Sequence, residues 1–319
     1  MAEVTVGIDI GGTNTKIGIV DREGKLHQHA NIETGAYEDV EDYFNAMVTA
    51  IRKLNKKLPT DFQLLGIGVG AANGNYYTGT IDKSTNLRWK GTIHLAKMFT
   101  QEFDIPCLLT NDANAAALGE MIYGKAKGMK DFIVITLGTG LGSGFVCNGQ
   151  LLNGHNGIAG EIGHTSVTPN GRFCNCGKRG CLETYVSATG IRRTVYKLLA
   201  DYLEPSELRG ISFEDLSTKM ITEAALRGDV VAKQCFEYTG RILGIKLSDT
   251  VVHTDPEAVF LFGGLAQAGD LIFNPTIRHM EENLMPLFRG KVKILPSGLT
   301  NQAAPILGAS SLVWDYLKK

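Results

Sequence analysis

The sequence has 319 residues, of which 44% are hydrophobic and 20% are charged. A chain of this kind can bury a sizeable core and is long enough for two domains, which excludes a fibrous or disordered protein. Its formal net charge is -1, so no overall field attracts nucleic acid or an anionic membrane, and we expect small-molecule partners instead.

The N-terminus begins with strand-like alternation rather than with a targeting sequence. It has no basic region followed by a long apolar run, and no later stretch approaches the roughly 20 apolar residues of a membrane span. We therefore expect a cytoplasmic protein. Residues 4–10 alternate between apolar and polar or small side chains, residues 11–14 read GGTN, and residues 17–26 resume the strand character.

The glycine-rich turn at residues 11–14 has two interpretations. A strand and not a helix follows it, so the segment matches neither the Rossmann nor the P-loop pattern. Glycines still let the backbone approach a phosphate closely, and successive turn N–H groups can bind an anion. A plain hairpin turn explains the same residues, because Gly and Asn are favoured in turns. Taken alone, the segment leaves both interpretations open.

A second copy of this layout favours the phosphate interpretation. Residues 133–146 repeat the pattern of residues 6–20, with Asp9 opposite Thr136 and the two Gly/Thr turns opposite each other within a residue. The duplication predicts two similar α/β domains whose turns meet across a ligand cleft. This resembles the superfamily of sugar kinases, heat-shock chaperones and actin, in which ATP lies between the two turns. The resemblance implies that Asp9 faces the Mg²⁺ of the nucleotide, mostly through water.

The remaining pattern alternates helices and strands. We expect helices over residues 38–57, 92–102, 219–253 with an interruption near Gly228, and 302–317, and strands over 64–69, 107–110 and 258–262. No linker divides the chain, so the domain boundary should be a hinge. We place it near residue 112, which gives a smaller domain of residues 1–112 with the C-terminal helix 302–319, and a larger one of residues 113–301.

Asn111 and Asp112 stand directly before an alanine run that propagates a helix. Either residue is a good N-cap, which is the simplest interpretation. An acid at the end of a strand that points into a cleft is also placed where α/β proteins bind ligands, and the positive end of the helix is expected to keep it ionised. A sugar hydroxyl attacks phosphorus well only if a base accepts its proton, and Asp112 is the candidate.

Four potential metal ligands lie within eighteen residues, with the spacing H-x9-C-x-C-x4-C: His164, Cys174, Cys176 and Cys181. This Cys₃His set suits a closed, structural zinc site in the loop 164–183. A disulfide or chance clustering is less favoured in a reducing compartment. Lys178 and Arg179 raise a nucleic-acid alternative, but two basic residues are a small footprint, so no nucleic acid is expected.

The segments LGTGLGSGFVCNGQLLNGHNGIAGEIGH and CNCGKRGCLE resemble the signature of the ROK family, which contains bacterial sugar kinases and sugar-responsive repressors. The resemblance extends from IDIGGTNTK through NDANAAALGE to LFGGLAQAG and so covers almost the whole chain. It implies an ATP-dependent hexose kinase, first of all for glucose, with Mg²⁺, a structural zinc and a homodimeric assembly.

The resemblance also assigns residues to each ligand. Those implied to bind the sugar are Asn73, Asn86, Asn111, Asp112, Gly140, Glu161, His164 and Glu183. Those implied to bind the nucleotide and its Mg²⁺ are Asp9, Gly11, Gly12, Thr13, Lys16, Thr136, Gly138, Thr139, Gly263 and Gly264. Many members have a Gly-Pro turn where this chain reads GAANG over residues 70–74, and this departure weakens the assignment of the sugar loop and of the substrate.

Three alternatives stay open at this point. The first is a kinase for another hexose, namely mannose, fructose, N-acetylglucosamine or N-acetylmannosamine, because polar contacts of this kind do not select one hexose. A sugar-sensing repressor of the family would carry a helix-turn-helix ahead of the first strand, and the start of this chain shortly before Val4 favours the kinase. An actin-like or chaperone ATPase would leave Glu161, His164 and Glu183 without a role.

Overall fold

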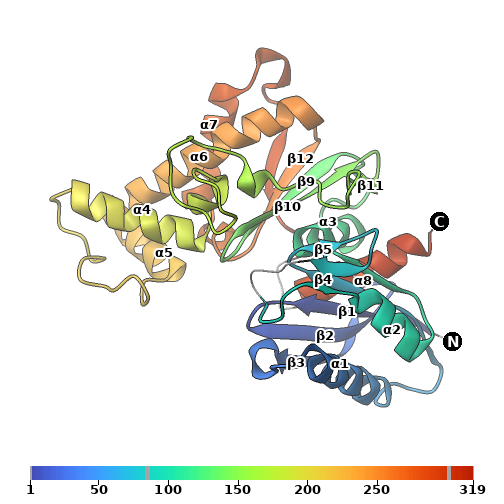
Figure 1. Cartoon of the computed structure of the whole chain (residues 1–319). Coiled ribbons are helices and arrows are strands. Elements are labelled where there is room, and N and C mark those ends of the chain that lie inside the picture. Colours follow the sequence, from blue (N-terminus) through green and yellow to red (C-terminus); the bar gives the residue numbers. More distant parts are fainter. Residues whose placement is uncertain (1, 83–86, 300–302, 319) are drawn as a thin grey trace. The chain divides into compact units, whose positions relative to one another are not determined.

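The structure is a computed structural model that describes residues 2–82, 87–299 and 303–318 (Figure 1). Asn86, one of the residues expected to bind sugar, lies outside these ranges. The chain divides into two compact units. Unit 1 comprises Met1–Met129, Gly144–Gly160 and Ser297–Lys319, and unit 2 comprises Lys130–Ser143 and Glu161–Pro296.

Unit 1 is built on a five-stranded sheet in the order β3-β2-β1-β4-β8. The strands are β1 (Ala2–Ile10), β2 (Asn14–Asp21), β3 (Leu26–Glu33), β4 (Phe62–Ala71) and β8 (Cys107–Thr110). The first three strands pair antiparallel, whereas β4 runs parallel to β1 and to β8. A small second sheet contains β5 (Gly74–Asn75), β6 (Thr80–Asp82) and β7 (Thr92–Ile93). The predicted strand-turn-strand start of the chain is confirmed.

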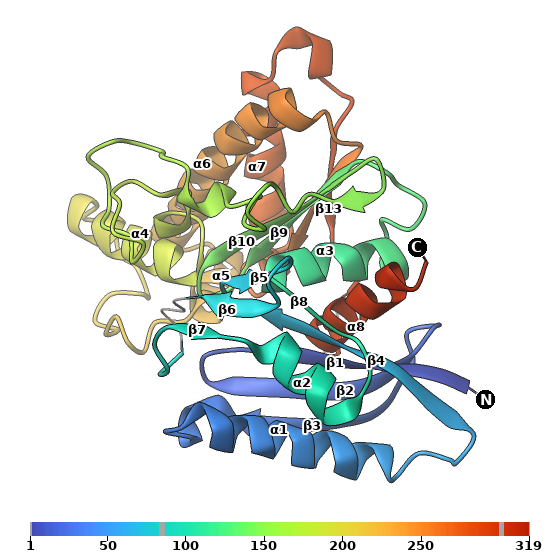
Figure 2. The same ribbon diagram turned by 45° about the vertical axis from the view of Figure 1, so that its right-hand side comes forward.

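Helices cover both faces of this sheet (Figure 2). The apolar side chains of β1 form one core with α1 (Val40–Asn55) and α2 (Leu95–Phe103). The opposite face meets α3 (Asp112–Tyr123) and α8 (Ala304–Tyr316). Here a Cβ atom on Gly68 would lie 1.9 Å from the carbonyl oxygen of Ala309, and one on Gly7 would lie 2.1 Å from that of Ile306. Glycine at these two positions therefore lets α8 lie directly on the strands.

Unit 2 contains the larger part of a second five-stranded sheet, in the order β11-β10-β9-β12-β13. Its strands are β9 (Phe132–Leu137), β10 (Leu141–Cys147), β11 (Gln150–Leu151), β12 (Ala258–Phe262) and β13 (Lys293–Pro296). The helices are α4 (Ala188–Asp201), α5 (Thr218–Arg227), α6 (Val230–Thr254) and α7 (Asp270–Asn283). Gly240 and Gly244 of α6 allow α7 to approach closely, since a Cβ atom on Gly244 would lie 2.5 Å from the carbonyl oxygen of Thr276.

The two sheets correspond strand by strand, which confirms the predicted repeat. In each, a pair of strands joined by a Gly/Thr turn is followed along the chain by a strand that runs parallel to the first. The long helical pattern is interrupted at Gly228, which has φ of +103° and ends α5, while the Asp229 side chain caps α6. Within the described ranges no helix is both long and apolar enough to cross a membrane.

The compact units differ from the predicted domains in three segments. The sequence puts the boundary near residue 112, whereas unit 1 also contains residues 113–129, residues 144–160 and the segment that begins at Ser297. For α3 the reason is its close packing against α8. A Cβ atom on Gly308 of α8 would lie 2.8 Å from the carbonyl oxygen of Ala115 on α3. The contact between these helices depends on residues almost two hundred positions apart and leaves no local signal in the sequence.

Candidate active site and metal cluster

The turn between β1 and β2 is fixed by backbone hydrogen bonds on both sides. The Gly11 N–H donates to the Asn14 carbonyl (3.0 Å), and the Thr34 N–H donates to the Thr13 carbonyl (2.8 Å). Below the turn, the buried Thr15 hydroxyl hydrogen-bonds the hydroxyls of Thr34 and Tyr43. Gly12 and Thr13 remain exposed. The turn is therefore held rigidly while its tip stays accessible to a ligand.

Asp9 and Asp112 come together next to this turn. Asp9, on β1, pairs with Lys16 of β2 on one side and with Gly70 of β4 on the other. A Cβ atom on Gly70 would lie 3.6 Å from the Cα atom of Asp112, an ordinary contact distance, so Asp112 lies next to the strand position that pairs with Asp9. Burial, and then the Asp112 carboxylate, raise the pKa of Asp9 to about 6, while the Lys16 ammonium lowers it. Two carboxylates thus share one small region of unit 1.

Asn111 and Asp112 divide the two roles that the sequence leaves open. Asn111 is the N-cap of α3, and its Oδ1 atom accepts the Ala113 N–H at 2.8 Å. Asp112 is the first helical residue; the residue is exposed, although its carboxyl group is surrounded by protein. Desolvation by the surrounding protein raises the pKa of Asp112, and the hydrogen bond from the Ala113 N–H lowers it by less. The pKa of Asp112 is therefore raised overall, in spite of the position of this residue at the start of a helix.

The loop that departs from the family pattern has a well-defined geometry. Asn73 is exposed and has φ of +59°, a left-handed conformation that Asn tolerates. Its Nδ2 atom donates to the Asp82 carbonyl at 3.1 Å. Gly74 passes so close to β8 that a Cβ atom would lie 2.3 Å from the carbonyl oxygen of Thr110. Asn73 therefore shapes the turn, and its sugar contact stays a prediction.

In unit 2, the turn between β9 and β10 has the same kind of support. The Gly138 N–H donates to the Gly140 carbonyl at 3.1 Å, and the Gly138 carbonyl accepts the N–H of Ala188, the first residue of α4, at 2.9 Å. The Thr189 hydroxyl donates to the Thr139 carbonyl at 3.3 Å. Gly138 and Thr139 are exposed, and no atom lies within 4 Å of the place that a Cβ on Gly138 would take.

The Glu183 carboxylate links this turn to the cysteine loop. One oxygen, Oε2, accepts the Leu141 N–H at 3.0 Å, directly after the turn. The other, Oε1, lies 3.7 Å from the Cys174 thiol. A Cβ atom on Gly140 would lie 2.4 Å from Glu183 Oε2, so a larger residue there would displace the Glu183 carboxylate. The structure therefore gives Gly140 a supporting role: it leaves room for the carboxylate expected to bind sugar.

The four predicted metal ligands converge. The ligand atoms of His164, Cys174, Cys176 and Cys181 all lie within 4.8 Å of one another. The His164 Nδ1 atom is 3.8 Å from the Cys174 sulfur, and the sulfurs of Cys176 and Cys181 are 3.6 Å apart. Three sulfurs and one nitrogen at such separations fit a tetrahedral ion of the size of Zn²⁺. All six cysteines of the chain are free thiols.

Sequence reasoning missed the residue that fastens this loop to the rest of unit 2. The Arg172 guanidinium donates to the carbonyls of Thr184 (2.8 Å) and Gly190 (3.0 Å) and to the Thr194 hydroxyl (3.0 Å). It also lies over the Tyr185 ring, 4.5 Å from the centroid. Its partners are 12 to 22 residues away and span a helix start, so no local spacing reveals them. Arg172 anchors the loop through contacts that are independent of the metal ligands.

Two more predicted residues, Gly263 and Gly264, follow β12. Gly263 has φ of +104°, and a Cβ atom there would lie 2.6 Å from the Leu137 carbonyl oxygen at the end of β9. The Leu265 N–H donates to that same carbonyl at 3.2 Å. Glycine at position 263 is therefore required by the backbone, whereas Gly264 is exposed and has free space beside it.

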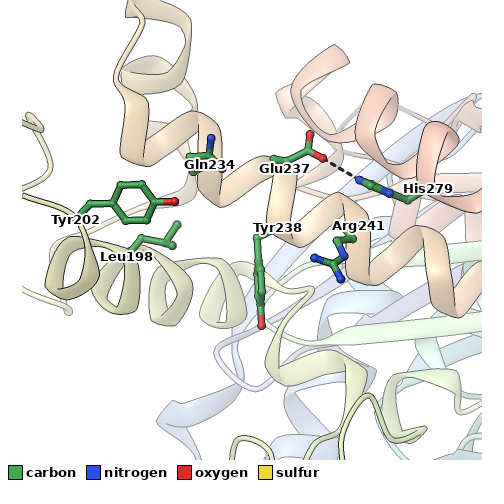
Figure 3. Close-up of a pocket in the computed structure, with 7 residues that line it drawn as sticks. All are labelled: Leu198, Tyr202, Gln234, Glu237, Tyr238, Arg241 and His279. Carbon is green, nitrogen blue, oxygen red and sulfur yellow. Dashed lines mark hydrogen bonds and ion pairs between the residues drawn. The ribbon is translucent and has the colours of Figure 1, made fainter. Parts of the chain in front are cut away.

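A hollow of about 310 Å³ lies elsewhere in unit 2, among α4, α6 and α7 (Figure 3). Its lining contains none of the predicted site residues. Glu237, at its rim, accepts hydrogen bonds from Arg278 (2.5 Å) and from His279 (2.8 Å), which join α6 to α7. The polar side chains of Glu237, Arg278 and His279 therefore serve to pack α6 against α7.

Known proteins resemble this chain over nearly its full length. The model of the ROK family matches residues 5–316. A glucokinase of Halalkalibacterium halodurans is 34% identical over 309 residues, which is 95% of this chain and 93% of that protein. A xylose repressor of Bacillus spizizenii is 29% identical over 324 residues, which is 99% of this chain and 78% of the repressor.

A solved structure gives the same result. The crystal structure of a ROK family glucokinase from Streptomyces griseus, in complex with glucose and AMPPNP, matches with a TM-score of 0.80 and 30% identity. The match covers 98% of this chain and 99% of that one. It confirms the predicted fold class, the α/β fold shared by sugar kinases, actin and heat-shock ATPases. The matched residues include both Gly/Thr turns and the cysteine loop, and the chain belongs to the ROK family.

Proposed function

We propose that the protein transfers the γ-phosphoryl group of ATP to a hexose, with glucose as the preferred substrate and its 6-hydroxyl as the acceptor. The observation that carries this proposal is the pair Asp9 and Asp112, two carboxylates of unit 1 beside a glycine-rich turn whose tip is exposed. Phosphoryl transfer requires one acid near the metal-bound phosphates and one base for the attacking hydroxyl. A sensor that only binds sugar requires neither.

Residues of unit 1 would supply the base and part of the phosphate site. Asp112 accepts the hydroxyl proton, and Asn111 can donate its amide to the sugar because its Oδ1 atom is occupied by the helix cap. The raised pKa of Asp112 suits a group that must take a proton during the reaction. Asp9 would face the water shell of Mg²⁺, which neutralises phosphate charge when bound.

Residues of unit 2 would hold the sugar and the rest of the nucleotide. Glu161, His164 and Glu183 are the sugar-binding residues that the family resemblance implies. Glu183 is the best supported of the three, because its carboxylate is fixed by the Leu141 N–H at 3.0 Å while the residue remains partly exposed. A preorganised acceptor of this kind orients a sugar hydroxyl at little entropic cost.

The metal cluster would be structural. Its residues can supply four ligands to Zn²⁺ and so leave no open position, which a catalytic zinc requires. The bound ion would crosslink the loop that begins at His164 and ends at Glu183. Because the Cys174 sulfur lies 3.7 Å from the Glu183 carboxylate, we propose that the metal holds Glu183 in place for the sugar.

A sugar-responsive regulator is the second candidate, since a xylose repressor is 29% identical to this chain. The glucokinase relatives are slightly more similar, and one solved relative is described with glucose and a nucleotide analogue. We prefer the kinase because Asp9 and Asp112 both lie beside the glycine-rich turn of unit 1.

The experiment is a steady-state assay of ADP release with a panel of glucose, mannose, fructose, N-acetylglucosamine and N-acetylmannosamine. We expect sugar-dependent ADP release with the highest kcat/KM for glucose. Asp61→Asn, a change of an exposed acid at the far end of the β1–β4 pair, is a matched control and should behave as the unmodified protein. ADP release that does not depend on any sugar would contradict the proposal.

A further inference from the structure

The chain passes between the two units at four places, namely residues 129–130, 143–144, 160–161 and 296–297. Near two of these places, unit 1 contains a buried acid with no role in the proposed chemistry. Glu120 lies in the last turn of α3 and is 1% exposed. Its Oε1 atom accepts the N–H groups of Lys125 and Gly298, both at 2.8 Å, and its Oε2 atom accepts the Ser297 hydroxyl at 2.6 Å.

One carboxylate therefore ties two crossing segments to one helix. Residues 124–125 precede the crossing at 129–130, and residues 297–298 follow the crossing at 296–297. The two segments also touch directly, since a Cβ atom on Gly298 would lie 2.7 Å from the Lys125 nitrogen. A Cβ atom on Gly124 would lie 2.5 Å from Glu120 Oε1. The segments can meet the carboxylate only because glycine stands at both positions.

The other end of α3 meets a third crossing. A Cβ atom on Gly144, the first residue after that crossing, would lie 2.6 Å from the Ala113 carbonyl oxygen. Ala113 directly follows Asp112. The 12-residue helix thus spans about 18 Å between one crossing at its start and two at its end. A helix whose two ends are both held by neighbouring backbone segments gives its first turn, and so Asp112, a fixed position.

We propose that Glu120 is a positioning residue, which fastens the crossing segments at 124–125 and 297–298 to α3 and thereby keeps Asp112, at the other end of this helix, in place. This inference rests on the proposed kinase function for its effect on turnover. The fastening itself is independent of that function. The carboxyl group suits the task because its two oxygens can accept several hydrogen bonds, and its three partners here all act as donors.

The test compares two variants by hydrogen exchange of the protein alone and by kinetics with glucose and ATP. In Glu120→Ala, the amides of Lys125 and Gly298 lose their acceptor, and we expect about 10-fold or faster exchange there with little change in β1 or β4. We also expect a fall in kcat of about 10-fold or more, with an unchanged glucose affinity in a direct titration. Glu120→Gln, which keeps an acceptor oxygen, should recover most of both losses.

The matched control is Asn114→Ala. Asn114 is similarly buried on α3, but among the described residues its side chain bonds Thr110 alone, so exchange at residues 125 and 298 should not change. If Glu120→Ala does not fold, Ser297→Ala removes one of the three hydrogen-bond donors to Glu120 and should give smaller changes in amide exchange and in kcat. Unchanged exchange at residues 125 and 298 overturns the fastening. Faster exchange with a normal kcat overturns the positioning role. If the unmodified protein has no kinase activity, the proposed function is refuted, and the exchange measurement still decides whether Glu120 fastens the two segments.

Discussion

Replacing Asp9 by Asn should make the protein more stable and at the same time remove its ability to use ATP. The pKa of Asp9 is raised from an ordinary 3.8 to about 6, chiefly by burial and then by the Asp112 carboxylate. A raised pKa in an acid means that folding disfavours its ionised form. Between about pH 4 and about pH 6, Asp9 holds a proton in the folded protein that it has released in the unfolded chain. Its contribution to the free energy of unfolding therefore decreases as the pH rises through that window.

The size of this effect follows from the shift. About two pKa units correspond to about 3 kcal/mol, which is the upper limit of what ionised Asp9 costs the fold above pH 6. Asp9 is only half-buried and shares its environment with Asp112, so we expect Asp9→Asn to gain about 1 to 2 kcal/mol at pH 7.5 and nothing near pH 4.

Urea denaturation in the presence of a chelator, at several pH values, measures this gain, and calorimetric titration with ATP and Mg²⁺ measures the loss of binding. Asp61→Asn serves again as the control, because Asp61 is exposed, and its stability difference should be close to zero at each pH. An Asp9→Asn protein that is less stable than the parent at pH 7.5, or whose gain does not vary with pH, would refute this account of the Asp9 carboxylate.

Three further predictions concern the base, the second turn and the metal. Asp112→Asn should lower kcat by about 10² or more with nearly unchanged glucose affinity, and a near-normal kcat would remove Asp112 from the mechanism. Gly138→Val should fold normally, because no atom lies within 4 Å of the new Cβ position and the backbone is not left-handed there. The variant should nevertheless fail to use ATP while it still binds glucose. Equal loss of both ligands would mean that the turn is needed for folding. Cys176→Ser or strong chelation should release zinc and weaken glucose binding more than ATP binding, as measured by metal content and titration on one sample; normal glucose binding without zinc would contradict the structural role.

Much of the fold could be predicted from local patterns. The alternation before the first glycine turn, its recurrence over residues 133–146 and the break at Gly228 all correspond to observed elements, because strand pairing, turns and helix ends depend on neighbouring residues. The metal cluster was predictable for the same reason, since all four ligands lie in one short loop. Helix α7 has no such signal, because Pro275 lies inside it.

The parts that sequence reasoning missed depend on contacts between distant segments. Glu120 bonds Ser297, which is 177 residues away, and Arg172 bonds groups on both sides of the start of α4. The raised pKa of Asp112, caused chiefly by desolvation, also arises from tertiary packing. Such features follow from how segments meet, so no pattern within one segment contains them.

The most direct test of the central claim is to identify the product. The protein is incubated with glucose, ATP and Mg²⁺, and the mixture is followed by phosphorus NMR, with Asp112→Asn as the blank. We predict the resonance of a 6-phosphate ester, formed in equal amount with ADP, and none with the variant over the same time. Glucose binding by calorimetry without any phosphate ester would contradict the kinase and make the protein a sugar sensor.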